Sequence, residues 1–479
     1  MNSKWGNTYK NVLLLIIIMV TGKYNVILVI VDTLRWDHVG CLGGLARTPN
    51  IDRLCREGVV FTRAYPESLP TIPVRRAIYT GKRVFPFRDK PLLRRGIPWI
   101  RMAGWQPIPD EDTTMAEFLK GKGYRTALIG DNYHIFEPGM NFNRGFDEWI
   151  FIRGQEWDHY RSFKVPDEVV NRYLTPSLKG TAVERLIRRY LANVSFRRSE
   201  EDWFPALTFR EAVRWLSENR DAERFLLVVE SFDPHEPWDP PHEFVDMYDP
   251  GYSGPEVITP KYGPVDYLSE RELKHMRAHY AGEVTLVDKW FGYFMQKFYE
   301  LNLDKNTILI LISDHGHQLG EHGLTGKVAW GLYPELVNIP LIIRHPEYVN
   351  SGIKVNEFVY DHDIFPTVCS LIGLDCSGLG LDGLNIWSYV EGKANVVRSY
   401  VTSAFGNYVM YRDDEYWLIS DRSGSSTQLY ELRNDPELRR NIASEAPDKV
   451  KELFNRIIKD AGGKLEPLPT EEKRPIQVV

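Results

Sequence analysis

The chain contains several short apolar segments in which Val, Ile and Leu follow one another without alternating with polar residues. Such runs are typical of strands that are buried on both faces, as in a parallel sheet covered by helices. Segments with helical spacing separate them, among them Thr114–Gly123 and Phe209–Ala222. We therefore predict an α/β fold in which helices sandwich a large, mostly parallel sheet. The strands expected from this pattern are Tyr24–Val31, Tyr124–Gly130, Arg224–Phe232, Thr307–Ser313 and Pro340–His345.

The pattern changes after about Leu371, where Gly and Ser become more frequent and the apolar segments become shorter and alternate with polar residues. Alternation of this kind, as in residues 407–413 and 415–423, is typical of antiparallel strands. A last helical segment, Pro447–Asp460, follows them. We therefore predict a large domain over residues 23–370 and a smaller C-terminal α+β domain, with an antiparallel sheet, a terminal helix and a tail, over residues 371–479.

The composition is that of an ordinary globular protein, with 43% hydrophobic and 26% charged residues among 479. This length agrees with about two domains of 100–250 residues each. The net charge is −6, so no broad positive field is available for a phosphate backbone, and we expect no nucleic acid partner. The oligomeric state cannot be read from the sequence.

The first 22 residues form a segment with two alternative interpretations. Val12–Val20 is an apolar run that is shorter than the about 20 residues of a membrane-spanning helix, so we expect no stable membrane span. It has the length of a signal-peptide core, and residues 20–22 could form a small-residue cleavage site. In the other interpretation the start is mis-called and translation begins at Met19. The protein is therefore either cytoplasmic or exported through this signal-like segment.

The chain has four cysteines, none of them in a Cys-x-x-Cys pair, so a thiolate zinc site is not expected. Nothing in their spacing resembles a disulfide framework. Free cysteine packs as a small hydrophobic residue. We therefore expect four free, buried thiols, at Cys41, Cys55, Cys369 and Cys376.

Acidic and histidine residues follow four of the predicted strands directly. In open α/β sheets, ligands bind beyond the carboxyl ends of the strands. A single Asp at such a position is commonplace, because Asp also starts loops and caps helices. Four such endings together predict a metal or anion site at one edge of the sheet. The residues concerned are Asp32, then Asp131 and His134, then Asp233 and His235, and finally Asp314, His315 and His317.

Asp32, Asp314 and His315 are the best candidates for metal ligands among these residues. Carboxylate oxygen and imidazole nitrogen suit Ca²⁺, Mg²⁺, Mn²⁺ or Zn²⁺. Glycines after Asp314 and His315 permit a tight turn directly behind the strand. For Asp32 the alternative is a helix cap. We expect one divalent metal ion as cofactor, with a second ion as an open alternative.

The segment Ser68–Arg83 contains a second candidate feature, the beginning of a helix. Pro73 is tolerated in a first helical turn, and Thr71 stands at a natural N-cap position. The N-terminus of a helix favours an anion, and Arg75 could add two donors to the same oxyanion. The alternative is that Thr71 only caps the helix and that Arg75 forms a salt bridge.

Eight motifs follow one another between about Tyr24 and about Ala443. They are NVILVIVDTLRWDHVGCLGG, TPNIDRLCREGVVFTRAY, TIPVRRAIYTGKR, FDPHEPWDPP, SDHGHQLGEHGLTGK, DIFPTV, LDGLNIW and LYELRNDPELRRNIA. In this order they resemble the sulfatase family, within the alkaline phosphatase superfamily. The resemblance implies an alkaline phosphatase-like fold with the catalytic domain over residues 23–370.

The resemblance implies a role for each residue that matches a family motif. Thr71 falls at the nucleophile position of the Cys/Ser-x-Pro-x-Arg motif, and Arg75 is the arginine that orients and stabilises the nucleophile. His235 resembles the active-site histidine near the leaving group, and Lys327 resembles the lysine that contacts the substrate anion. The implied metal ligands are Asp32, Thr71, Asp314 and His315.

Three departures from the family pattern change this expectation. Sulfatases oxidise Cys or Ser to formylglycine at the nucleophile position, and Thr71 cannot yield that aldehyde. Thr33 stands where many sulfatases have a second Asp. The usual Gly-Lys-x-His segment is replaced by residues 130–134, which bring in Asp131 as either a metal ligand or a partner of Arg75 or Lys82. The role of His134 in this segment stays open as well.

We predict from these residues a metal-dependent hydrolase that cleaves a small anionic ester through a Thr nucleophile. The ion would lower the pKa of the Thr71 hydroxyl, and His235 or His317 would protonate the leaving oxygen. A phosphorus ester, such as a phosphodiester or a phosphonate or phosphate ester, is favoured, because water can attack phospho-threonine at phosphorus, whereas sulfo-threonine is harder to clear. The alternatives are a sulfuric ester hydrolase (sulfatase), a phospho-alcohol transferase and a non-catalytic descendant that binds anions.

Overall fold

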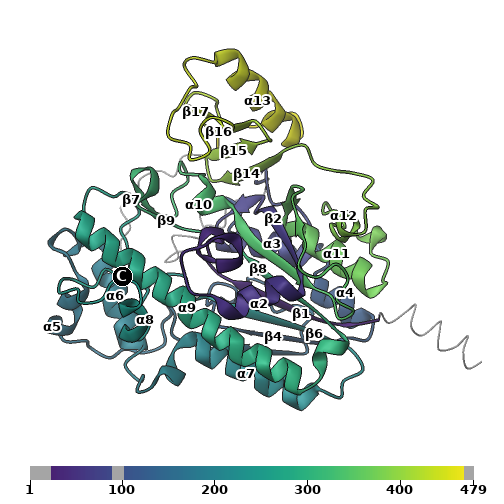
Figure 1. The fold of residues 1–479 in the computed structure, drawn as a ribbon, viewed down its shortest axis with the longest axis horizontal. Helices are drawn as coiled ribbons and strands as arrows, with labels where there is room; N and C mark the ends of the chain where they lie inside the picture. Colours follow the sequence, from purple (N-terminus) through teal and green to yellow (C-terminus); the bar gives the residue numbers. More distant parts are fainter. Residues whose placement is uncertain (1–22, 89–101, 469–479) are drawn as a thin grey trace, which may run out of the picture.

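The computed structural model describes residues 23–88 and 102–468, so the signal-like segment over residues 1–22 lies outside the described residues. In the described part, a nine-stranded sheet forms the centre of the molecule (Figure 1). Most of its strands run parallel, and among the described strands β11 runs antiparallel to both of its neighbours. Their order is β12 (Lys354–Val355), β2 (Val59–Tyr65), β11 (Ile339–Arg344), β8 (Thr307–Ser313), β1 (Asn25–Val31), β6 (Phe225–Ser231), β4 (Arg125–Gly130) and β5 (Glu148–Phe151), with β13 (Val359–Tyr360) also on β2.

The predicted strands all form, with ends that shift by no more than a residue or so. Every residue of β1 is buried, and its side chains alternate between two hydrophobic cores. Ile27 and Val29 belong to the core on one face of the sheet, and Val26 and Leu28 belong to the core on the other. Because successive side chains of a strand point to opposite faces, a strand between two helical layers needs an apolar residue at every position. The predicted α/β sandwich is confirmed.

Helices cover both faces of this sheet. The core on one face includes residues of α2 (Pro49–Glu57), α7 (Phe204–Asn219) and the long α9 (Glu270–Glu300). The core on the other face includes residues of α3 (Thr71–Thr80), α4 (Met115–Gly121) and α11 (Ile364–Ile372). The remaining helices are α5 (Asp167–Val170), α6 (Ala182–Asn193), α8 (His242–Asp246), α10 (Pro334–Val337), α12 (Trp387–Val390) and α13 (Pro447–Asp460).

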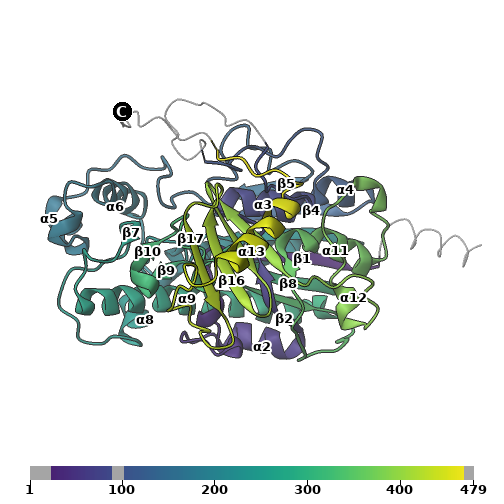
Figure 2. The ribbon, with the colours of Figure 1, turned by 90° about the horizontal axis from the view of Figure 1, so that it is seen from above.

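A second sheet stands beside the central one and carries α13 on one side (Figures 1 and 2). Its antiparallel strands are β14 (Val401–Phe405), β15 (Tyr408–Arg412), β16 (Tyr416–Asp421) and β17 (Thr427–Glu431), as the alternating pattern predicted. Its fifth strand, β3 (Ser68–Leu69), comes from the N-terminal half of the chain and pairs parallel with β14. The C-terminal sheet is therefore joined by backbone hydrogen bonds to the segment that leads into α3. The domain boundary at residue 371 stays a prediction.

A short three-stranded sheet is formed by β7 (Gly263–Pro264), β10 (Leu324–Gly326) and β9 (Gln318–Leu319). It pairs the segments on either side of Glu321 and connects them to the segment before α9. Among the described residues, none of the helices has both the length and the apolar character needed to cross a membrane.

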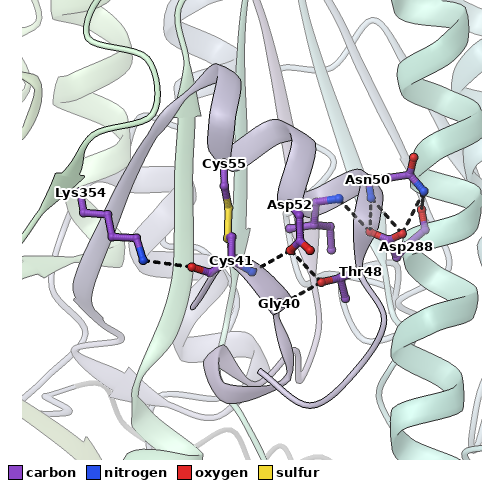
Figure 3. The surroundings of a disulfide bond; sticks show 9 residues. Gly40, Cys41, Thr48, Asn50, Asp52, Cys55, Asp288 and Lys354 are labelled. Carbon is purple, nitrogen blue, oxygen red and sulfur yellow. Dashed lines mark hydrogen bonds between the residues drawn. A yellow bond between two sulfur atoms is a disulfide. The ribbon is translucent and has the colours of Figure 1, made fainter. Parts of the chain in front are cut away.

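The expectation of four free thiols is wrong for one pair, because Cys41 and Cys55 form a disulfide (Figure 3). The bond ties the 3-10 turn Gly40–Leu42 to α2. Asp52 supports the same turn, since its carboxylate accepts hydrogen bonds from the Cys41 N–H at 2.7 Å and from the Thr48 hydroxyl at 3.0 Å (Figure 3). A separation of 14 residues carries no signal by itself, and the return of the chain into α2 brings the two sulfurs together. The other two cysteines are free.

Candidate active site

The candidate site lies at the carboxyl ends of four adjacent strands. The strands β8, β1, β6 and β4 are neighbours in this order and run parallel to one another. Each ends in the acidic and histidine residues that the sequence singled out, so the prediction that these residues share one edge of the sheet is confirmed. The side chains of Asp32, Asp314 and His315 are fully buried at this edge.

Asp32, Asp314 and His315 form a group whose donor atoms lie within 4.8 Å of one another. Donors that surround one ion at about 2.0–2.6 Å can be no more than about 5 Å apart, so this spacing fits a single divalent cation. The Nδ1 atom of His315 lies 2.9 Å from the carbonyl oxygen of Gly316. When Nδ1 donates to that oxygen, Nε2 keeps its lone pair, as a metal ligand requires.

Thr71 is the first residue of α3, and Pro70 occupies the N-cap position. The expectation that Thr71 is the N-cap is therefore wrong by one residue, and the Thr71 hydroxyl makes no capping bond. Its Oγ1 instead lies 3.3 Å from Nε2 of His315. The hydroxyl is thus buried beside the candidate ligands, at the end of the helix where the dipole favours negative charge.

Arg75, one turn into α3, is fully buried among three carboxylates. Its Nη1 donates to Asp314 at 2.6 Å and to the Thr71 carbonyl at 3.2 Å. Its Nη2 lies 3.0 Å from Asp32, and both Nε and Nη2 contact Oε2 of Glu230, at 2.9 and 2.8 Å. The salt-bridge interpretation of Arg75 is therefore confirmed, and its donation to a substrate oxyanion stays a prediction.

The ionised side chains of this group carry more negative than positive charge. Asp32, Asp314 and Glu230 carry three negative charges when ionised, and Arg75 supplies one positive charge. Burial, followed by repulsion from Asp314, raises the pKa of Asp32 well above its usual value, and burial raises the pKa of Glu230. Two uncompensated negative charges in a dry site are costly. A divalent cation would balance them, and the residues present therefore fit the expected metal ion.

A second cluster contains Lys327, His235 and Glu236. The Lys327 ammonium lies 2.8 Å from Nε2 of His235 and 2.9 Å from both carboxylate oxygens of Glu236. His317 contributes Nε2 at 3.4 Å from Glu236, and Tyr262 donates its hydroxyl to the same carboxylate. The charge of Lys327 acts on Asp32 and on His315, so the two clusters are electrostatically joined.

The imidazole of His235 is neutral at pH 7. Its pKa falls to about 4, because burial and the neighbouring charge of Lys327 outweigh the attraction of the Glu236 and Glu156 carboxylates. Nδ1 of His235 lies 2.7 Å from the Glu236 carbonyl, which leaves Nε2 to accept from Lys327. That His235 or His317 protonates a leaving group stays a prediction, and in this arrangement Lys327 donates the hydrogen bond to the neutral His235 ring.

Asp131 takes neither of the roles that its position suggested. Its carboxylate accepts hydrogen bonds from the Phe232 N–H at 2.8 Å and from Gln155 at 2.9 Å, and Gln155 also donates to Asp233 at 2.7 Å. Burial raises the pKa of Asp131 to about 6. Lys82 pairs elsewhere, with Asp112.

The next residues of this loop have separate surroundings. Asn132, not Asp131, reaches Asp32, with its side-chain nitrogen 3.5 Å from Oδ2. Nε2 of His134 lies 3.7 Å from Glu156, and its ring packs edge-on against Trp105.

Two residues of the site were missed by the sequence analysis, Glu230 and Glu236. Glu230 lies inside the buried strand β6, and a charged residue in an otherwise apolar strand is the signal that could have identified it. Glu236 follows His235 inside one of the motifs, but Lys327, with which it pairs, lies 91 residues further along the chain.

Comparison with known proteins finds a family model and relatives that match most of the chain. The model of the Sulfatase family matches residues 24–374. An arylsulfatase of Clostridium perfringens is 25% identical over 485 residues, which cover 93% of this chain and 95% of that protein. The multifunctional alkaline phosphatase superfamily protein PehA of Trinickia caryophylli is 25% identical over 466 residues, which cover 85% of this chain and 83% of that protein.

Solved structures show a similar fold. The phosphonate monoester hydrolase SpPMH from Silicibacter pomeroyi superposes with a TM-score of 0.70 at 21% identity, covering 91% of this chain and 95% of that one. The phosphonate monoester hydrolase of Agrobacterium radiobacter superposes with a TM-score of 0.69 at 21% identity, and the match covers 92% of this chain and 95% of that one. At this identity the similarity concerns the fold alone.

Proposed function

Because the chain belongs to the sulfatase family, we propose that it is a metal-dependent hydrolase that cleaves a phosphorus ester through the hydroxyl of Thr71. Ester-cleaving hydrolases make up the family matches, and such enzymes typically bind a divalent metal ion. The substrate that we propose is a phosphodiester or a phosphonate or phosphate ester. The observation that carries the proposal is the buried Thr71 hydroxyl, 3.3 Å from Nε2 of His315. The Thr71 carbonyl accepts a hydrogen bond from Arg75, which also pairs with Asp32 and Asp314.

Asp32, Asp314 and His315 would hold the metal ion, which would lower the pKa of the Thr71 hydroxyl so that it reacts as an alkoxide. Ion pairs with three carboxylates hold the Arg75 guanidinium in one position before the reaction begins. Donors that are organised in advance each contribute about 10²–10³ in rate. Arg75 and Lys327 would therefore stabilise the charge that develops on the oxygens of the phosphoryl group.

The reaction would proceed in two displacements at phosphorus. In the first, the Thr71 oxygen forms a bond to phosphorus, the bond to the leaving oxygen breaks, and Lys327 gives its proton to that oxygen. In the second, water attacks phosphorus, the Thr71 oxygen leaves, and the proton of the water returns to the neutral Lys327 amine. His235 accepts a hydrogen bond from Lys327 and thereby holds it in place. Covalent intermediates of this kind divide one difficult step into two easier ones.

The side chain at position 71 favours phosphorus over sulfur. A Thr cannot be oxidised to the formylglycine that sulfatases use to release sulfate, whereas a phospho-threonine can be cleared by attack at phosphorus. The second candidate function is a sulfuric ester hydrolase, and the sulfatase relatives favour it. A phospho-alcohol transferase and a non-catalytic anion-binding protein remain further alternatives.

A substrate panel separates these candidates. We expect the purified protein, supplied with a divalent metal, to hydrolyse phosphodiester or phosphonate monoester substrates faster than aryl sulfates. An inversion of this order would support the sulfatase alternative. Transfer of the phosphoryl group to an added alcohol would support the transferase, and tight anion binding without turnover would support a binding protein.

Variants of Thr71 test the nucleophile directly. Thr71→Ala removes the hydroxyl and should reduce kcat by at least about 10⁴, as removal of a nucleophile does in other hydrolases. Thr71→Ser is the matched control, because it keeps the hydroxyl and should retain most of the phosphoesterase activity. Peptide mass analysis should find unmodified threonine at position 71. Full activity of Thr71→Ala, or an aldehyde at this position, would exclude the mechanism.

The disulfide between Cys41 and Cys55 bears on the compartment. Disulfides form and persist in oxidising surroundings and are rare in the cytosol of most organisms. We therefore favour the exported form of the protein over the cytoplasmic one. Fractionation of cells that express the full chain tests this choice, since the exported protein should be recovered outside the cytosol with its disulfide intact.

A further inference from the structure

Glu256, His275 and His279 form a second group of donor atoms that lie within 4.8 Å of one another. His275 and His279 stand one turn apart on the first part of α9, so both side chains lie on the same face of the helix. Glu256 lies in the loop between α8 and α9, two elements that run side by side in Figure 1. None of the three residues takes part in the chemistry described above.

The contacts within this group converge on one carboxylate oxygen. Oε2 of Glu256 lies 2.8 Å from Nε2 of His275 and 2.5 Å from Nε2 of His279. A carboxylate can only accept hydrogen bonds, so each of these contacts needs either a proton on the imidazole or a shared cation. Both imidazoles are buried, and the rings stand perpendicular at 4.8 Å between centroids.

Protons alone are an expensive way to satisfy this arrangement. His275 would have to be a buried imidazolium, because its two ring nitrogens face the carboxylates of Asp249 and Glu256, whereas His279 needs only the single Nε2 proton of a neutral ring. Neutral imidazole, by contrast, is the form that binds metals. A cation between the three atoms would satisfy all three lone pairs at once.

The surroundings of His275 are those of a metal-bound histidine. Its Nδ1 lies 2.8 Å from Oδ2 of Asp249. A carboxylate in this position fixes the ring orientation and the tautomer that leaves Nε2 free for a metal. The ring of Tyr252 stacks on the other side at 3.7 Å between centroids and completes the packing of the imidazole.

We propose that Glu256, His275 and His279 bind a structural Zn²⁺ ion. Two imidazoles and one carboxylate form a donor set that zinc prefers over Ca²⁺ or Mg²⁺, which take oxygen ligands. His242, at the beginning of α8, lies outside this group, because its Nδ1 pairs with Asp246 at 3.3 Å and its Nε2 is 3.8 Å from Oε1 of Glu256. The fourth position would therefore be left to water, and zinc would tie the loop after α8 to α9.

The loop that carries Glu256 is linked to the candidate active site through Trp238. The loop that carries Glu256 continues to Ile258, whose carbonyl accepts the N–H of Trp238 at 2.7 Å. The ring of Trp238 packs edge-on against His317 of the candidate active site at 4.9 Å. Loss of the ion should therefore loosen the loop on which Trp238 rests.

The test measures metal content in the full-length protein. After removal of metals with a chelator and titration with Zn²⁺, the wild type should bind one ion per chain more than the double variant His275→Gln/His279→Gln. His159→Gln, which changes an exposed histidine elsewhere, is the matched control and should bind as many ions as the wild type. Equal stoichiometry in wild type and double variant would overturn the proposal.

A second measurement does not depend on the folding of the double variant. Co²⁺ in the wild-type protein should give the visible absorption of a four-coordinate ion, and Glu256→Gln should weaken or remove it. The experiment is repeated in an Asp314→Asn background, which disables the candidate catalytic site. Absorption that disappears with Asp314→Asn and is unaffected by Glu256→Gln would assign all binding to the catalytic site and would refute a second site.

Discussion

Replacement of Glu230 by Gln tests whether the buried carboxylates are balanced by a metal ion together with Arg75. Gln keeps the shape of the side chain and can still accept a hydrogen bond, but it removes one of the three negative charges around Arg75. The guanidinium then shares its charge with Asp32 and Asp314 alone. Both carboxylates become weaker metal ligands as a result.

The size of the effect follows from the two contacts that Arg75 makes with Glu230, from Nε at 2.9 Å and from Nη2 at 2.8 Å. Hydrogen bonds to charged groups contribute about 1.5–3 kcal/mol, compared with about 0.5–1.5 kcal/mol for neutral ones. Both bonds keep the charged Arg75 as donor in the variant, so the difference between these two ranges is an upper bound on what each bond loses. For the metal itself we expect the 10–100-fold loss of affinity or activity that is typical when a residue supporting metal ligands is changed.

The assay is a metal titration of the chelated protein, followed by kcat/KM at saturating metal. Tyr79→Phe is the control, because it removes the hydroxyl that donates to Glu230 at 3.0 Å and leaves all charges in place. It should bind the metal nearly as tightly as the wild type. If Glu230→Gln had the metal affinity and kcat/KM of the wild type, the charge balance that we infer for this site would be incorrect.

Two more predictions concern pH and the disulfide. The rate should fall as the pH is lowered through about 4, because protonated His235 would repel Lys327 and no longer accept its hydrogen bond. His235→Gln should lose this part of the acid limb, and a rate that rises on acidification would instead make His235 the proton donor. The unreduced, denatured protein should react with thiol reagent at two cysteines, and at four after reduction. Reduction should also lower the free energy of unfolding, by about 3 kcal/mol for a loop of this length. Four reactive thiols before reduction would exclude the Cys41–Cys55 bond.

The sequence was sufficient for the fold and for the group at the strand ends. Nearly continuous apolar runs identify strands that lie between two helical layers. Because these strands are parallel, the residues that follow their carboxyl ends meet at one edge of the sheet. Asp32, Asp314 and His315 come together for this reason. Their use as metal ligands, and the roles of Thr71 and Lys327, are proposals that rest on this geometry and on the family.

The remaining features depend on contacts that sequence spacing does not encode. Thr71 was misplaced by one residue because Pro70 can also precede a helix, and the end of a helix is the least certain part of such a prediction. Asp131 finds its partner in Gln155, which lies on another loop. Glu230 was overlooked because it stands inside a strand that otherwise reads as apolar.

The pairing of β3 with β14 gives the C-terminal sheet an influence on the reacting group. Ser68 and Leu69 are hydrogen-bonded to the edge of that sheet, and the chain enters α3 at Thr71 two residues later. A relative with a different C-terminal sheet would present another edge to this segment and would shift the hydroxyl with it. Chimeras that exchange this region between family members would therefore need to exchange residues 66–70 along with it, or they would fold and yet align their nucleophile poorly.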